Sequence, residues 1–217
     1  MSPAFLAALV LLGAAATLAY LRGTRRNRRL ASAISRQLEE TLRPLSTEYV
    51  NIGGSIGYHF RYALSGPFAS AKGTVTLSPR HSLLYLPVSR LLGVRDRLFL
   101  NLFSERPLRG EGHVVRTTLL RGADIEGAER MERREVEAGG RRFTLLWRGG
   151  DLAADLESLL RSLPAPGRLV HFCAFPGSGT LFLRTEPDGG AVAADLEAVV
   201  RSAPSWLAAG PGSGQAS

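Results

Sequence analysis

Hydrophobic positions open the chain in an almost unbroken run. From Pro3 to Leu21, only Thr17 and Tyr20 carry polar side-chain atoms. A helix of these nineteen residues, at about 1.5 Å rise per residue, just spans a hydrocarbon core of about 30 Å. The run therefore predicts a transmembrane helix, and the anchor with its basic flank is assigned to residues 1–29.

Arginines dominate the positions that follow the apolar run. They are Arg22, Arg25, Arg26, Arg28 and Arg29. Basic residues mark the cytoplasmic end of a membrane helix, so the N-terminus is expected outside and the remainder in the cytoplasm. Near an anionic leaflet each basic residue can also contribute about 1 kcal/mol by contact with head groups. These five residues are therefore the predicted membrane-surface group.

A cleaved signal peptide is the alternative interpretation of the same run. Alanines between Ala14 and Ala19 fit a small-residue cleavage site. A signal peptide, however, carries positive charge before its apolar segment, whereas the charge here follows the segment. An uncleaved single-pass anchor in the cell membrane is the favoured prediction.

Beyond the arginines the apolar positions take up helical spacing and then strand alternation. Residues 30–46 predict an amphipathic stalk helix that can continue the membrane helix and that Pro44 should end. Its apolar positions at helical spacing are Leu30, Ile34, Leu38, Leu42 and Leu45. Residues 47–208 predict a soluble domain of the α+β class, mainly antiparallel, with two helices in its C-terminal third. Residues 209–217 are rich in Gly and Ser and predict a disordered tail. The expected strands lie at 49–52, 58–62, 74–77, 97–103 and 113–120, the hairpins at 130–147 and 169–184, and the helices at 151–163 and 191–203. Gly139-Gly140 is the predicted turn of the first hairpin.

The net charge of +8 and pI near 10.7 do not indicate nucleic acid binding. Without the five arginines beside the membrane segment, the remainder carries only +3, an ordinary balance for a soluble domain. The lone cysteine, Cys173, excludes an intrachain disulfide and fits a reducing compartment.

Acidic residues are absent from a long internal stretch. No Asp or Glu occurs between Glu48 and Asp96. A basic face for anionic lipid or an acidic partner protein is one interpretation. Buried strands, which exclude charge of either sign, are the other and the favoured one. The basic residues of the stretch are Arg61, Lys72, Arg80, Arg90 and Arg95.

Candidate catalytic chemistry is limited to weak patterns. Ser55 sits in a Gly-x-Ser-x-Gly spacing typical of a nucleophile elbow, for which His171 is a candidate base. The elbow requires a following helix, whereas the residues after it alternate like a strand, so a plain glycine-rich turn is favoured. His171 and Cys173 share a strand face, but two ligands do not make a metal site. The pattern indicates no metal and no cofactor.

The segment 78–92 is apolar, flanked by arginines, and too short to span a membrane. It predicts either an inward strand that breaks at Pro87 and leads into one helical turn, which is favoured, or a segment that dips into the membrane interface.

The block 51–103 contains Ile-Gly-Gly-Ser-Ile-Gly-Tyr-His and Ser-Pro-Arg-His-Ser-Leu-Leu-Tyr-Leu-Pro. It resembles a family of N-terminally anchored prokaryotic proteins of unknown function, with archaeal origin expected. The resemblance implies an anchor followed by a cytoplasmic domain, and it implies no catalytic residue.

Taken together, the sequence predicts a membrane-anchored cytoplasmic module that binds or organises something at the membrane surface, either a partner protein or anionic lipid, without catalysis. A membrane-tethered serine hydrolase that uses Ser55 is the alternative.

Overall fold

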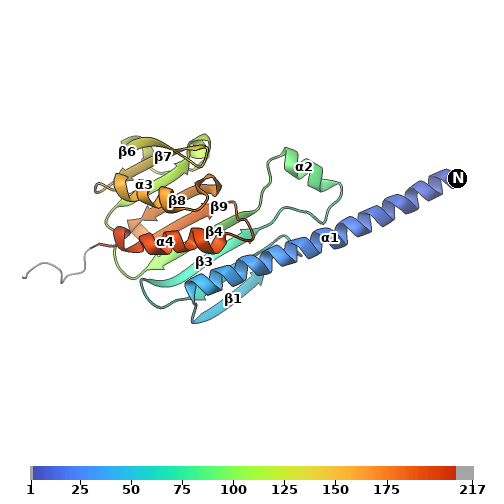
Figure 1. Ribbon diagram of the computed structural model, residues 1–217, viewed down its shortest axis with the longest axis horizontal. Helices are drawn as coiled ribbons and strands as arrows, with labels where there is room; N and C mark the ends of the chain where they lie inside the picture. Colours follow the sequence, from blue (N-terminus) through green and yellow to red (C-terminus); the bar gives the residue numbers. More distant parts are fainter. Residues whose placement is uncertain (1, 209–217) are drawn as a thin grey trace, which may run out of the picture.

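The chain forms one long helix and a single nine-stranded antiparallel sheet (Figure 1). The computed structural model describes residues 2–208. The α+β class predicted from the sequence is confirmed, with helices near the C-terminus. The predicted disordered tail, 209–217, lies outside the described residues.

Helix α1 runs without interruption from Pro3 to Leu42, so the apolar run and the amphipathic stalk form one rod. Ser2 caps its start, where the Phe5 amide donates to Ser2 Oγ at 3.3 Å, and Pro3 occupies the first turn, where its missing N–H costs nothing. At the other end, Arg43 adopts a left-handed conformation (φ 47°) and its amide donates to the Glu39 carbonyl. Pro44 then prevents continuation, as predicted.

Every neighbouring pair of strands in the sheet is antiparallel. The order is β1-β2-β3-β4-β9-β8-β5-β7-β6. The strands are β1 (Ser46–Asn51), β2 (Gly57–Ala63), β3 (Phe68–Thr76), β4 (Arg97–Ser104), β5 (Glu111–Arg116), β6 (Glu132–Ala138), β7 (Arg141–Arg148), β8 (Leu169–Phe175) and β9 (Thr180–Thr185).

The last hairpin joins two parts of the sheet that are formed by earlier segments. Strand β9 pairs with β4, while β8 pairs with β5. Strands β1 to β4 form a meander on one side, and β5 to β7 lie on the other. The β6–β7 turn is the predicted Gly139-Gly140, and both glycines have positive φ (55° and 68°) as a tight hairpin requires.

Three helices pack on one face of the sheet, namely the second half of α1, α3 (Ala153–Ser162) and α4 (Val192–Trp206) (Figure 1). Ile34 and Leu38, two of the predicted apolar positions of the stalk, are fully buried against this face. Gln37 ties α1 to the start of α4, because it donates to the Gly189 carbonyl at 2.6 Å and accepts from the Ala193 amide at 3.0 Å.

The opposite face of the sheet is covered over only part of its width. A 3₁₀ helix, Thr117–Gly122, contacts β5 and β7, and Thr117 Oγ1 lies 3.1 Å from Thr144 Oγ1. The strand predicted over 113–120 therefore ends early, at Arg116. Strands β2, β3 and β4 keep exposed or half-exposed side chains on this face, including Arg61 and Lys72.

The connection between β3 and β4, residues 77–96, leaves the sheet and carries helix α2 (Tyr85–Leu91). We call it the excursion. The favoured prediction of an inward strand here is wrong, because Leu83 and Leu84 form a turn and Pro87 lies inside the first turn of α2. A helix accommodates proline there, where backbone N–H groups have no intrahelical partner.

Candidate functional site

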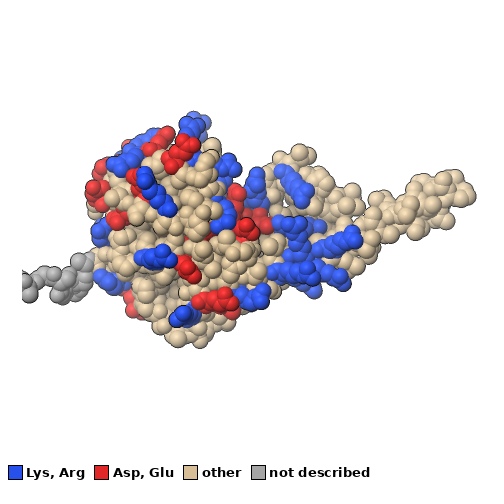
Figure 2. Space-filling model, viewed as in Figure 1, with Lys and Arg blue, Asp and Glu red and all other residues tan. Residues whose placement is uncertain are grey.

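The five arginines beside the membrane segment lie on α1 where the helix leaves the sheet domain. All five are exposed, and within residues 2–208 none of them forms an ion pair. Figure 2 shows Lys and Arg side chains gathered between the uncharged, projecting part of α1 and the body, whereas Asp and Glu on this face lie over the body. The N-terminal part of α1 is long and apolar enough to cross a membrane, and none of that stretch is buried by the domain. It is consistent with either a membrane anchor or a signal sequence.

The excursion is held against α1 next to these arginines. Asn27, which is fully buried, donates to the Ser78 carbonyl at 2.9 Å and accepts from Arg80 at 3.0 Å. Gly23 permits the close approach, since a Cβ there would lie 2.1 Å from the Arg80 carbonyl oxygen. The rings of Tyr20 and His81 meet edge to face at 5.9 Å.

An ion pair fixes the two ends of the excursion to each other. Arg80 makes two hydrogen bonds to Asp96, at 2.9 and 2.6 Å, and the Ser78 amide donates to the same carboxylate at 2.8 Å. Burial alone raises the pKa of Asp96, but the bonds from Arg80 and Ser78 outweigh it and hold the pKa below its usual range. The excursion is therefore a closed loop with a defined position rather than a loose connection.

Helix α2 buries a polar side chain and exposes apolar ones, which is the reverse of a helix that packs on a core. Its buried residue is Ser89, whose hydroxyl donates to the Leu86 carbonyl at 2.8 Å. The neighbouring leucines point outward, with Leu84 81%, Leu91 88% and Leu92 71% exposed. Figure 1 shows α2 standing off the sheet domain beside the middle of α1. Of the two predictions for 78–92, this geometry agrees with the interfacial segment.

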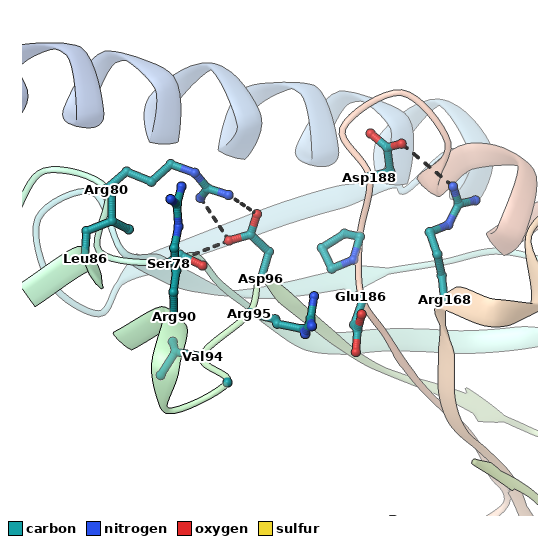
Figure 3. A pocket seen from close by; sticks show the side chains of 12 residues that line it. Ser78, Arg80, Leu86, Arg90, Val94, Arg95, Asp96, Arg168, Glu186 and Asp188 are labelled. Atoms are coloured by element: carbon teal, nitrogen blue, oxygen red, sulfur yellow. Dashed lines mark hydrogen bonds and ion pairs between the residues drawn. The ribbon is translucent and has the colours of Figure 1, made fainter. Parts of the chain in front are cut away.

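A cleft of about 490 Å³ separates the excursion from the loop after β9. Arg80, Arg90 and Arg95 reach it from the excursion, and Arg168 and Asp188 line the other side (Figure 3). Arg80 is neutralised by Asp96, and Arg168 by Asp195 at 3.0 Å. In the part of the chain that the structure describes, Arg90 and Arg95 have no such partner, and the cleft is lined by four arginines against the three acids Asp96, Glu186 and Asp188.

The predicted basic face is split between two places. Arg80, Arg90 and Arg95 meet at the cleft, whereas Arg61 and Lys72 line a shallow depression of about 260 Å³ on the open face of β2 and β3. Arg61 lies 3.7 Å from Glu48, and the Lys72 amine stands 5.3 Å above the Phe103 ring.

Ser55 and His171 are not brought together. Ser55 lies in the turn between β1 and β2, while His171 is on β8, four strands away across the sheet. At about 4.8 Å per strand, this separation is about 19 Å. Ser55 instead lines a small cavity with His81, Thr24 and Arg28, and no acidic residue lines that cavity to orient a base.

His171 belongs to a buried chain of polar side chains. His113 lies 3.1 Å from His171 and 3.0 Å from Glu111, and Glu111 in turn accepts from Arg148. Burial lowers the pKa of His171 to about 3 and raises the pKa of Cys173 to about 12, so the imidazole is neutral and the thiol protonated at pH 7. A protonated thiol is a poor nucleophile and metal ligand. Within residues 2–208, no group of three or more His, Cys, Asp or Glu is arranged to hold a metal ion.

Arg97, Arg116 and Arg184 were not singled out from the sequence, yet they lie beside the cleft around a second, smaller cavity. They come from β4, β5 and β9. The pattern of hydrophobic positions predicts each strand but not that β4 pairs with β9.

No known family model matches the chain, and no curated protein is significantly similar to it.

Proposed function

We propose that this protein is a single-pass membrane-anchored module whose domain lies against the cytoplasmic leaflet and binds or organises a partner there without catalysis. The observation that carries the proposal is that α2 buries Ser89 and exposes leucines. The helix also lies next to the arginines of α1. We call this outward set (Leu84, Leu91 and Leu92) the α2 leucines.

The exposed α2 leucines can stabilise the protein only if an apolar environment, such as lipid or a partner surface, removes them from water. Moving one leucine side chain out of water gains about 1.5–3 kcal/mol. Seven residues of helix are too short to span a bilayer but suit insertion of one face to the head-group boundary. Arg90 and the α1 arginines lie beside this face and would contact anionic lipid, at about 1 kcal/mol each.

The orientation of the module is inferred from charge. The arginines follow the apolar part of α1, which favours the N-terminus outside and the domain in the cytoplasm. The uncovered part of the sheet, where Arg61 and Lys72 lie, supports a protein partner with an acidic surface.

Depth-dependent fluorescence quenching tests the membrane contact of α2. The full chain with Leu91→Cys is labelled with a fluorophore and reconstituted in vesicles that carry doxyl-labelled lipids. Cys173 is buried and should not react. We expect strong quenching at position 91 and little at Leu45→Cys, a control that is 72% exposed in the connection after α1, away from the apolar run. Equal, weak quenching at both positions would contradict the proposal.

Topology is tested separately. A protease-cleavable tag after Ser217 should be protected in intact spheroplasts and digested after permeabilisation. Digestion in both would place the domain outside. Retention of the protein in the membrane at alkaline pH distinguishes an anchor from a cleaved signal peptide.

A further inference from the structure

Four arginines surround the cavity of about 200 Å³ that adjoins the main cleft. Arg95 precedes β4, Arg97 begins it, Arg184 lies near the end of β9, and Arg116 ends β5. The register of β4 and β9 sets Phe99 opposite Arg184, and the Arg184 guanidinium stands 5.4 Å from the Phe99 ring centre. We call Arg95, Arg97 and Arg184 the rim arginines.

A single carboxylate, Glu186, lines this cavity, and it is already engaged. Its Oε1 accepts from Arg116 at 3.0 Å. Arg116 also donates to the Gly167 and Leu169 carbonyls, at 2.9 and 3.1 Å, so both partners of this pair are positioned by the fold. Among the described residues, the rim arginines form no ion pair, so no carboxylate of the protein neutralises them.

This arrangement is exceptional within the molecule. The other partly buried arginines of the described chain have a carboxylate in contact, as in the pairs Arg80–Asp96 at 2.6 Å and Arg168–Asp195 at 3.0 Å. Among the described residues, Arg97 and Arg184 are partly buried without such a contact, so at this cavity guanidinium groups converge away from bulk solvent with too few acids.

The convergence has an energetic cost that is visible at Arg184. Burial, together with the charges of Arg97 and Arg116, lowers the pKa of Arg184 from its usual value. The Nε atoms of Arg184 and Arg116 are buried and, within residues 2–208, have no hydrogen-bond partner. Like charges held together against repulsion, with unused donors, are typical of a site whose anion comes from outside.

We propose that the rim arginines bind a phosphate group, as a phosphomonoester or a diphosphate, which enters from the main cleft. Planar guanidinium forks match phosphate oxygens in pairs, and the two cavities adjoin, since Gly93, Arg95 and Glu186 line both. Placing this site at the membrane surface rests on the proposed function. The phosphate belongs either to an anionic lipid head group or to a soluble phosphate compound.

The experiment compares two charge-matched double variants of the full chain in nanodiscs. Arg97→Gln with Arg184→Gln removes two rim arginines, while Arg61→Gln with Lys72→Gln removes the same charge from the open face. Inorganic pyrophosphate is titrated calorimetrically into nanodiscs of zwitterionic lipid. In a second arm, retention of a soluble phosphatidic acid analogue with short acyl chains is measured in the same nanodiscs.

If the source is soluble, the wild type binds pyrophosphate and the rim variant binds it at least tenfold more weakly, while the control is unchanged. If the source is lipid, only the phosphatidic acid analogue shows this pattern. Binding of neither probe, or equal weakening in both variants, would overturn the site. Quenching at position 91 is independent of these measurements, so its retention would leave the membrane contact standing even where the phosphate site fails.

Folding of the rim variant is checked in the absence of anion. Because the substitution relieves repulsion, we expect the thermal midpoint not to fall. If the glutamine variant does not fold, Arg97→Lys with Arg184→Lys replaces it, since lysine keeps the charge but loses the fork. Pyrophosphate or analogue binding should then weaken with the fold intact, and unchanged binding of both probes would overturn the proposal.

Discussion

Helices α2 and α3 are both short and leucine-rich, yet they place their leucines in opposite directions. In α3, Leu156, Leu159 and Leu160 are buried against the sheet, and Arg161 points outward. In α2, Ser89 is buried and Leu91 is the most exposed of the large side chains near it. The outer face of α3 is suited to water, whereas the outer face of α2 is suited to lipid if this helix contacts the membrane as proposed.

The largest effect expected from this contrast is in the core helix. Leu156→Ala should lower the free energy of unfolding by about 2–5 kcal/mol, because it removes buried methyl groups and leaves a cavity. Leu91→Ala, the matched change in α2, should alter it by less than about 0.5 kcal/mol. Denaturant unfolding of both variants in detergent checks the pair. A large loss for Leu91→Ala would mean that α2 is packed like α3.

The next effect concerns the support of α2. Gly23→Ala should destabilise the contact between α1 and the excursion by about 1–3 kcal/mol, since its Cβ collides with the Arg80 backbone and the excursion must shift. Quenching of a label at position 91 should fall. Gly13→Ala, at which a Cβ meets nothing within 4 Å, is the control and should leave both readings unchanged.

Acid should weaken the same support through Asp96. Arg80 and Asp96 are about one-sixth exposed, and Asp96→Asn should cost about 2 kcal/mol at neutral pH. Since the folded pKa of Asp96 is lowered, its stabilisation is complete above about pH 4 and is lost as the pH falls through the folded pKa. The difference in unfolding free energy between wild type and Asp96→Asn should therefore shrink on acidification.

The exposed pair Arg61–Glu48 provides the control for that measurement. Glu48→Gln should change the unfolding free energy by less than about 0.5 kcal/mol, because solvent screens this pair. A pH response of the same size in both variants would show that the Asp96 contact is not responsible.

The smallest effect on stability should come from Leu91→Glu. An exposed position tolerates charge, so unfolding should change by less than about 0.5 kcal/mol. Insertion into lipid should nevertheless be lost, and a label at Leu84→Cys should no longer be quenched by doxyl lipids. Quenching that persists in the Leu91→Glu background would contradict insertion of this face.

Local chemistry explains which elements were predictable. Helical spacing located Ile34 and Leu38 on the buried face of α1, and Gly139-Gly140 located a hairpin turn, because each signal lies within a few residues. The order of strands could not be predicted, since the pairing of Arg184 with Phe99 joins residues far apart in the chain. Arg97 and Arg184 escaped sequence analysis for the same reason, whereas Arg95 lies in the acid-free stretch that the sequence indicates.

The prediction of an inward strand in the α2 segment is wrong for a different reason. An apolar run has the same composition whether it faces a protein core or lipid. The sequence around Leu84 and Leu91 therefore does not show whether these side chains are buried in the protein. Pro87 is compatible with a break in a strand and equally with the first turn of a helix, so the residue alone does not decide between the two.

The continuity of α1 from Pro3 to Leu42 has a mechanical consequence. Forty residues without a break make a shaft of about 60 Å that has no swivel between its apolar half and the half clamped to the sheet. Rotation of the helix about its own axis therefore rotates the sheet domain with it. Binding of a partner that holds the domain in place likewise restrains rotation of the apolar half. A partner helix that packs beside the apolar half would therefore fix the orientation of the whole domain.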